Sequence, residues 1–195
     1  MQMIPHGKKL VLASKSPRRQ ELLRQMGLEF SIRNQSIEET YPEELEGSAI
    51  AEYLASQKAN ALQHTLHSDE ILLTSDTVVW CNGQSLEKAA DAEEALEMLQ
   101  KLSGRSHEVI TAVCLQSTDF KEVFSDTVKV YFRELTDADM KYYISSCRPY
   151  DKAGAYGIQE WIGMTGITAI EGSFFTVMGL PTHLIYERLP KFGSR

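Results

Sequence analysis

The segment Glu70–Cys81, EILLTSDTVVWC, constrains the fold more than any other part of the chain. Its residues are almost continuously apolar over the length of a strand, which is typical of a central strand covered on both faces. Asp76 interrupts this pattern, and an aspartate there is costly to bury unless it is paired, bound to a metal ion or turned toward a cleft. We therefore take Asp76 as the candidate catalytic carboxylate. A structural aspartate that accepts hydrogen bonds from a neighbouring turn explains the residue equally well.

Strand and helix signals surround this segment. KLVLAS (9–14) predicts a short buried strand, and Ser16 as N-cap with Pro17 at the first helical position predicts a helix directly after it. Similar signals predict strands at 28–33, 107–116, 122–133 and 163–170, and helices capped by or beginning near residues 48, 91, 136 and 180. The stretch 151–166 carries four glycines and is expected to be mainly a functional loop. Residues 1–195 are expected to form a single α/β domain with a mixed central sheet flanked by helices.

The composition bounds the class of protein. With 195 residues and 43% hydrophobic side chains, the chain is long enough to bury the core of one ordinary domain. A net charge of -7 argues against a general nucleic-acid or membrane-surface binder, because both functions favour a basic surface. The three cysteines lie far apart and include no C-x-x-C pair, so neither a disulfide framework nor a zinc site is expected. Because no signal-peptide-like or membrane-spanning stretch is present, we expect a cytoplasmic protein.

The turn between the first strand and the first helix, ASKSPRR (13–19), is a candidate anion site. Arg18 and Arg19 fall in the first helical turn, where the helix dipole favours negative charge. An anion held by exposed backbone N–H groups and by both guanidinium groups explains this unfavourable placement of cations. Two solvated arginines on an exposed turn are the alternative.

Other charged residues are candidates for binding phosphate or metal. Lys88 follows an Asn-Gly turn and Lys152 lies in a glycine-flanked loop, where each can act as a point charge on phosphate, although a lone lysine is more often simply solvated. Glu38 and Glu39 are candidates to hold Mg²⁺ with Asp76, because this ion takes one or two carboxylates plus phosphate oxygens. They are equally consistent with a charged surface loop. The P-loop, zinc-protease, dinucleotide and serine-hydrolase motifs are all absent.

Seven segments together resemble the Maf family of nucleotide pyrophosphatases. They are ASKSPRRQELLRQMG, LASQKA, SDTVV, LEK, LSGRSHEVITAV, DKAGAYGIQ and GLP, and they occur in the family's order and spacing across nearly the whole chain. The resemblance implies an elongated α/β fold with a central mixed sheet and a cleft between two lobes, related to the ITPase-like house-cleaning enzymes and often homodimeric. It also implies a hydrolase that cuts a nucleoside triphosphate into a monophosphate and pyrophosphate with a divalent metal ion, Mg²⁺ or Mn²⁺.

The same resemblance implies roles for individual residues. Asp76 becomes the general base or metal-associated carboxylate, and Glu38 or Glu39 the acidic position that accompanies it. The implied substrate-binding residues are Ser14, Arg18, Arg19, Lys58, Lys88 and Lys152. DKAGAYGIQ resembles the subgroup that prefers dTTP and UTP, in which Arg18, Thr77 and Gln159 are associated with base selection. The Gln159 amide offers a donor and an acceptor side by side, which matches the edge of uracil or thymine, although a flipped amide also suits cytosine.

The chain departs from the family pattern at two places. Glu87-Lys88-Ala89 stands where the family usually has Gly-Lys-Pro, and Glu160 stands where it usually has glycine. A carboxylate at Glu160 either repels the nucleotide or points outward. Two other functions stay open. One is a nucleotide-binding regulator of septum formation without turnover, and the other is a purine-directed triphosphatase, which Gln159 disfavours.

Overall fold

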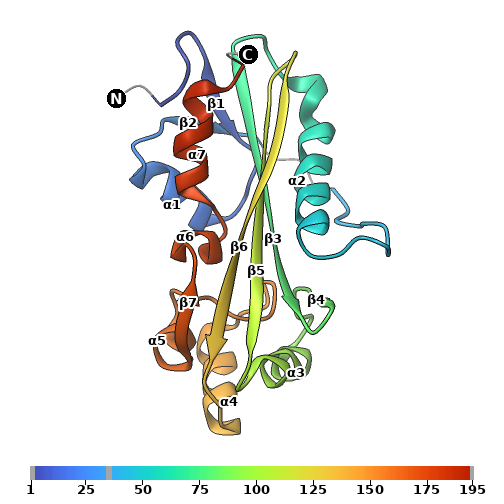
Figure 1. Ribbon diagram of the computed structural model, residues 1–195, viewed down its shortest axis with the longest axis vertical. Coiled ribbons are helices and arrows are strands. Elements are labelled where there is room, and N and C mark those ends of the chain that lie inside the picture. The colour runs from blue at the N-terminus through green and yellow to red at the C-terminus, as the bar shows by residue number, and fades with distance from the viewer. Residues whose placement is uncertain (1–2, 34–36, 194–195) are drawn as a thin grey trace. The chain divides into compact units, whose positions relative to one another are not determined.

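The computed structural model describes residues 3–33 and 37–193 (Figure 1). Within these residues the strands form a seven-stranded sheet with the order β2-β1-β3-β5-β6-β7, and β4 pairs with β3. β1 (Lys9–Leu12) runs parallel to β2 (Phe30–Ile32) and to β3 (Glu70–Cys81), whereas β4 (Gln84–Leu86) runs antiparallel to β3. β5 (Ser106–Gln116) lies between β3 and β6 (Lys121–Phe132), and β7 (Ile167–Glu171) is antiparallel to β6. The mixed sheet with its helices confirms the predicted α/β fold class.

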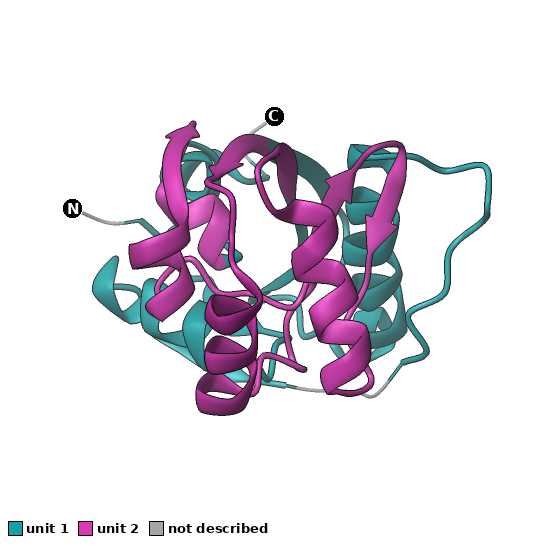
Figure 2. Cartoon of the chain, turned by 90° about the horizontal axis from the view of Figure 1, so that it is seen from below, with its two compact units in different colours: residues 1–76, 111–126, 179–195 teal, residues 77–110, 127–178 magenta. Residues whose placement is uncertain are grey.

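The chain divides into two compact units, shown in different colours in Figure 2. Unit 1 comprises residues 1–76, 111–126 and 179–195, and unit 2 comprises residues 77–110 and 127–178. Unit 1 contains α1 (Pro17–Gln25), α2 (Ser48–Leu62), α7 (Thr182–Arg188) and the short helices η1 (Gln63–Thr65) and η2 (Leu189–Lys191). Unit 2 contains α3 (Ala92–Leu102), α4 (Asp137–Cys147), α5 (Trp161–Gly166) and α6 (Phe174–Met178). The single domain over 1–195 and the cleft stay predictions.

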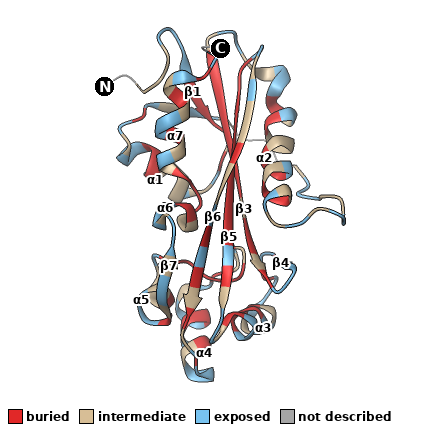
Figure 3. Cartoon of the chain, in the orientation of Figure 1, coloured by how far each residue is buried: buried red, intermediate tan, exposed pale blue. Residues whose placement is uncertain are grey.

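β3 is the buried strand that its apolar sequence predicts. All of its residues except Thr77 and Trp80 are buried, and Figure 3 shows the buried colour running along it. Two of its buried hydroxyl groups donate to backbone carbonyl oxygens, Thr74 Oγ1 to Ala55 at 2.6 Å and Ser75 Oγ to Gly179 at 3.4 Å. Among all the described residues of the chain, no helix is long and apolar enough to cross a membrane.

The helices begin largely where the sequence places their caps. Ser16 caps α1, Asp91 caps α3 by accepting two backbone N–H groups, and Thr136 caps α4 in a capping box with Asp139. α2 is the exception, because Gly47 is its N-cap and the expected cap, Ser48, is already the first helical residue.

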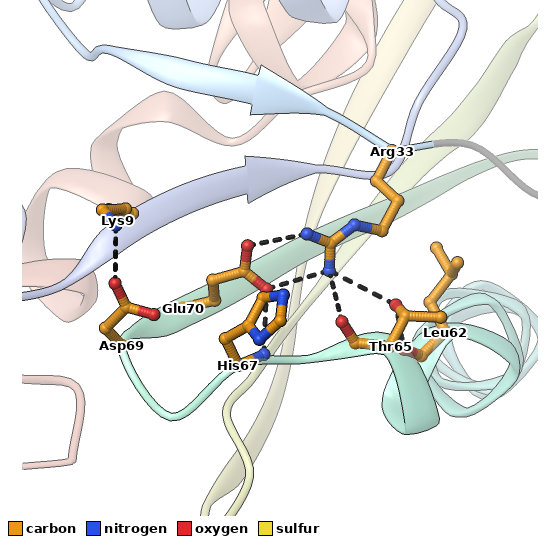
Figure 4. Close-up of polar contacts among 7 residues, drawn as sticks. All are labelled: Lys9, Arg33, Leu62, Thr65, His67, Asp69 and Glu70. Atoms are coloured by element: carbon orange, nitrogen blue, oxygen red, sulfur yellow. Dashed lines mark hydrogen bonds and ion pairs between the residues drawn. The ribbon is translucent and has the colours of Figure 1, made fainter.

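A network of charges joins the first residue of β3 to its neighbours in unit 1 (Figure 4). Arg33 binds the Glu70 carboxylate through both terminal nitrogens, at 2.9 and 2.6 Å, and also donates to the Thr65 carbonyl oxygen at 2.9 Å. The backbone N–H of His67 donates to the same carboxylate at 3.0 Å. The hydrogen bond from Arg33 holds the pKa of Glu70 below its usual value. This bidentate pair therefore links the end of β2 to β3 and η1.

The region 151–170 differs from its prediction. The expected loop over 151–166 ends in α5, so the strand expected at 163–170 begins only at Ile167. A Cβ at Gly163 would lie 1.9 Å from the Ile158 carbonyl oxygen. Glycine therefore allows this short helix to pack directly against the preceding backbone, a tertiary contact that outweighs the poor helix propensity of glycine.

Candidate functional site

The turn between β1 and α1 is built as an anion-compatible helix start. Ser16 Oγ accepts the backbone N–H of Arg19 at 3.5 Å, and the first helical turn contains no acidic residue. Ser14 is buried, and its Oγ accepts from the Ser16 backbone N–H at 3.2 Å and from Arg19 Nη1 at 3.5 Å. The Arg19 Nε donates to the Gly179 carbonyl oxygen at 2.8 Å. These bonds hold the Arg19 guanidinium at the positive end of the helix dipole.

Lys58 joins two carboxylates in unit 1. Its Nζ, from α2, donates to Asp76 Oδ1 on β3 and lies 2.8 Å from Glu39 Oε1, from the segment before α2. Lys58 and Asp76 are largely shielded from solvent, whereas the Glu39 side chain is more exposed. The structure thus brings together three residues to which the resemblance assigned roles and which lie 18 or more positions apart in sequence.

The electrostatic setting of Asp76 suits an acid–base role. Only 7% of the residue is exposed, and burial raises the pKa of its carboxyl group. The positive charges of Lys58 and Arg19 act in the opposite direction and lower this pKa, while the charge on Glu39 raises it. A carboxylate whose pKa is raised by burial and lowered by two nearby cations is typical of a functional site.

The acidic residues near Lys58 fit a divalent metal ion in part. Asp76 and Glu39 already converge on one cationic group, and oxygen donors of this kind suit Mg²⁺ or Mn²⁺. Glu38 is exposed, and Glu39 is the residue that contacts Lys58. Across residues 3–33 and 37–193, no group of three or more His, Cys, Asp or Glu side chains is arranged to hold a metal ion. Two carboxylates plus substrate oxygens are nevertheless a common Mg²⁺ ligand set.

The two candidate lysines of unit 2, Lys88 and Lys152, lie on segments that pair with each other. Lys88 forms an isolated antiparallel bridge with Ala153, and the Gly154 N–H donates to the carbonyl oxygens of Leu86 and Glu87 at 2.9 and 3.1 Å. Lys88 is exposed, whereas only 9% of Lys152 is exposed. The paired backbones bring these two candidate binding residues onto adjacent segments.

Lys152 is surrounded by carboxylates. Its Nζ donates to Asp151 Oδ1 at 2.6 Å and lies 3.0 Å from Glu160 Oε1. Tyr143 Oη donates to the other oxygen of Glu160. Glu160 thus turns toward Lys152 and Tyr143, and the alternative in which it simply points outward is wrong.

The proposed base-selecting residues lie on different elements. Gln159 is exposed, and its side chain lies against Gly157, where a Cβ would be 3.2 Å from Gln159 Nε2. Thr77 is half-buried on β3 and directly follows Asp76. Arg18 lies in the first turn of α1, where its charge acts on Arg19.

Sequence reasoning missed three participants. Gly179 contributes a backbone carbonyl, for which only its place in the GLP segment was a signal. Tyr143 lies in the helix expected after residue 136, and Asp151 lies in the DKAGAYGIQ segment, but neither pattern indicates a role beside Lys152. The contact of Tyr143 with Glu160, in particular, depends on the folded chain.

The comparisons agree with the resemblance. The chain is an α/β protein that belongs to the Maf-like protein family, whose sequence model matches residues 9–192. It is 48% identical over 181 residues to the dTTP/UTP pyrophosphatase of Flavobacterium johnsoniae, with 93% of each chain covered. It is 47% identical over 184 residues to the dTTP/UTP pyrophosphatase of Phocaeicola vulgatus, covering 94% of this chain and 95% of the relative. Among solved structures it is similar to the Staphylococcus aureus Ham1 protein, with 18% identity, 64% of this chain and 72% of that chain covered, and a TM-score of 0.46.

Proposed function

We propose that this protein is a nucleoside triphosphate pyrophosphatase with a house-cleaning role, which hydrolyses dTTP and UTP to the monophosphate and pyrophosphate. The observation that carries this proposal is the buried Asp76 carboxylate, bonded to Lys58 and attracted by the charge of Arg19. The names of relatives at 47 and 48% identity supply the substrate class. The absence of acidic residues from the first turn of α1 is consistent with an anionic substrate.

Asp76 is the general base in this proposal. It takes a proton from the water that attacks the α-phosphorus, and pyrophosphate leaves. Burial raises its pKa and so increases its basicity, while Lys58 and Arg19 keep the carboxylate populated before the proton is transferred. Asp76 and Glu39 would hold a divalent metal ion, Mg²⁺ or Mn²⁺, with Glu38 as a further candidate ligand. When bound, such an ion neutralises phosphate charge and lowers the pKa of coordinated water.

The remaining residues bind the nucleotide. Ser14, Arg18 and Arg19 bind phosphate oxygens at the start of α1, and Lys58, Lys88 and Lys152 add positive charge. Fixed cations stabilise the charge that develops on phosphate oxygens in the transition state. Gln159, with Thr77 and Arg18, selects uracil or thymine through the paired donor and acceptor of its amide. We place the protein in the cytoplasm as a homodimer that binds neither nucleic acid nor membranes.

The test is release of pyrophosphate and nucleoside monophosphate from dTTP, UTP, CTP, GTP, ITP and 7-methyl-GTP, with Mg²⁺ or Mn²⁺. We expect turnover of dTTP and UTP, and a loss on the order of 10²–10⁴-fold in Asp76→Asn, as is typical when a general base is removed. Near-normal turnover by this variant would exclude Asp76 as the base. Preferred turnover of ITP would indicate a purine-directed enzyme, and binding without turnover would indicate a regulator.

A further inference from the structure

Glu160 is fixed on both oxygens of its carboxylate. Tyr143 Oη donates to Oε2, and Lys152 Nζ lies 3.0 Å from Oε1. Tyr143 is itself held in place, because it is fully buried and its Oη accepts the Gly157 backbone N–H at 3.0 Å. A chain of contacts therefore runs from the Gly157 backbone through Tyr143 and Glu160 to the Lys152 ammonium group.

The position of Glu160 in α5 gives independent support. Glu160 is the N-cap residue of this helix, yet its side chain makes no capping hydrogen bond. Its backbone alone serves the helix, since its carbonyl oxygen accepts from Gly163 and Met164 at 3.0 and 3.2 Å. The carboxylate is thus directed to Lys152 and Tyr143 and contributes nothing to capping.

Two carboxylates hold the Lys152 ammonium group. Asp151 accepts one of its three N–H donors, and Glu160 forms an ion pair with it at 3.0 Å. The two carboxylates together restrict the orientation of the ammonium group. The Gln159 and Glu160 side chains also lie together over Gly157, where a Cβ would be 3.2 Å from Gln159 Nε2 and 2.9 Å from Glu160 Cδ.

We infer that Glu160, anchored by Tyr143, is a positioning residue that orients the Lys152 ammonium group toward the substrate. This inference rests on the proposed function, in which Lys152 binds the nucleotide. It also gives a use to the carboxylate at a position where the family usually has glycine. Glu160 itself acts on the substrate only through Lys152.

Glu160→Gln is the selective perturbation. The glutamine amide oxygen still accepts from Tyr143, so the shape and the buried bond are retained. Its NH₂ group then faces Lys152 and offers no acceptor, so the ammonium group keeps Asp151 but loses the second carboxylate that orients it. Glu171→Gln is the matched control, because Tyr131 Oη donates to Glu171 Oε1 at 2.6 Å in an exposed pair of the same unit.

The experiment is a double-mutant cycle on kcat and KM for dTTP and UTP with Glu160→Gln, Lys152→Met and the double variant. Loss of an oriented charged hydrogen bond corresponds to about 10–100-fold in kcat/KM. We expect Glu160→Gln to lose activity in this range, to add almost nothing in the Lys152→Met background, and Glu171→Gln to match the wild type. An equal loss from Glu160→Gln in both backgrounds would overturn the inference in favour of a structural role.

A second measurement does not depend on turnover. Lys152, only 9% exposed, should react slowly with an amine-acetylating reagent in the wild type, and Glu160→Gln should increase its labelling rate several-fold by mass spectrometry. Unchanged labelling would overturn the inference even in an active enzyme. A wild-type protein that hydrolyses no nucleotide would instead overturn the proposed function, and the labelling result would still decide whether Glu160 holds Lys152.

Discussion

The buried His107 of unit 2 should make the protein sensitive to acid. Only 3% of His107 is exposed, its Nε2 lies 2.7 Å from Tyr156 Oη, and its ring stacks on Phe132 with centroids 5.7 Å apart. Among the described residues its Nδ1 has no hydrogen-bond partner. Burial lowers the pKa of His107 from 6.5 to about 4, so the folded protein holds the imidazole neutral.

The sign and size of the effect follow from this shift. Because the folded-state pKa is below the unfolded one, the unfolded chain takes up a proton first as the pH falls. The stabilisation is therefore complete above about pH 6.5 and is lost progressively as the pH falls toward about 4. The full pKa shift corresponds to about 3 kcal/mol in the free energy of unfolding, of which about 2 kcal/mol is lost by pH 5.

Urea unfolding at pH 7.5 and pH 5 measures this loss. We compare the wild type with His107→Gln, whose amide can still bond Tyr156 but does not titrate. All other acid-sensitive groups are the same in both proteins. Between the two pH values the free energy of unfolding should therefore fall by about 2 kcal/mol more in the wild type than in the variant. An NMR titration of the His107 ring should show a midpoint near 4. An identical pH dependence in both proteins would refute the reasoning.

Three further perturbations test other parts of the structure. Lys58→Met removes a charge that lowers the pKa of Asp76, so the acid limb of the kcat/KM profile should move to higher pH. Glu70→Gln breaks the bidentate pair with Arg33 and should reduce the free energy of unfolding by about 2 kcal/mol at pH 7. Since the pKa of Glu70 is depressed in the fold, this contribution is present above its unfolded pKa and is lost as the pH falls through the folded value. Gly163→Ala should lower the unfolding free energy by about 3 kcal/mol or more, because its Cβ would meet backbone at 1.9 Å.

Two further substitutions serve as controls for these predictions. Glu21→Gln removes an exposed ion pair with Arg24, and its urea midpoint should match the wild type. Met164 lies next to Gly163 in α5 but is 74% exposed, so Met164→Ala should leave thermal unfolding unchanged. A Glu70→Gln or Gly163→Ala protein as stable as its control would contradict the role given to that residue, and an unmoved acid limb in Lys58→Met would do the same for the Lys58–Asp76 pair.

Local patterns predicted much of the fold. The apolar run 70–81 predicted β3, and Ser16, Asp91 and Thr136 predicted three helix starts, because strand burial and capping depend on nearby residues. α5 was missed because its six residues include two glycines, and only a tertiary contact at Ile158 explains its helical conformation.

The candidate site was predicted less completely. Asp76 was found because a carboxylate conflicts with an apolar strand, and the arginines because cations conflict with a helix start. Lys58 carries no such local conflict, and only the resemblance to a family drew attention to it. Glu39 was a candidate metal ligand only as part of an acidic pair that a charged surface loop explains equally well. The direction of the Glu160 carboxylate depends on Tyr143, seventeen positions earlier, which no periodicity connects to it.

The Gly179 carbonyl sets an order of events during protein synthesis. It accepts from Arg19, 160 positions earlier, and from Ser75, 104 positions earlier. A ribosome-bound chain that has not yet reached residue 179 can contain β1, α1 and β3 but lacks this acceptor. Contacts of such high sequence separation form late, after a large loss of chain entropy. The Arg19 guanidinium therefore takes the orientation set by this carbonyl only after residue 179 has been synthesised, whereas the Ser14 and Ser16 contacts of the same turn need only the first part of the chain.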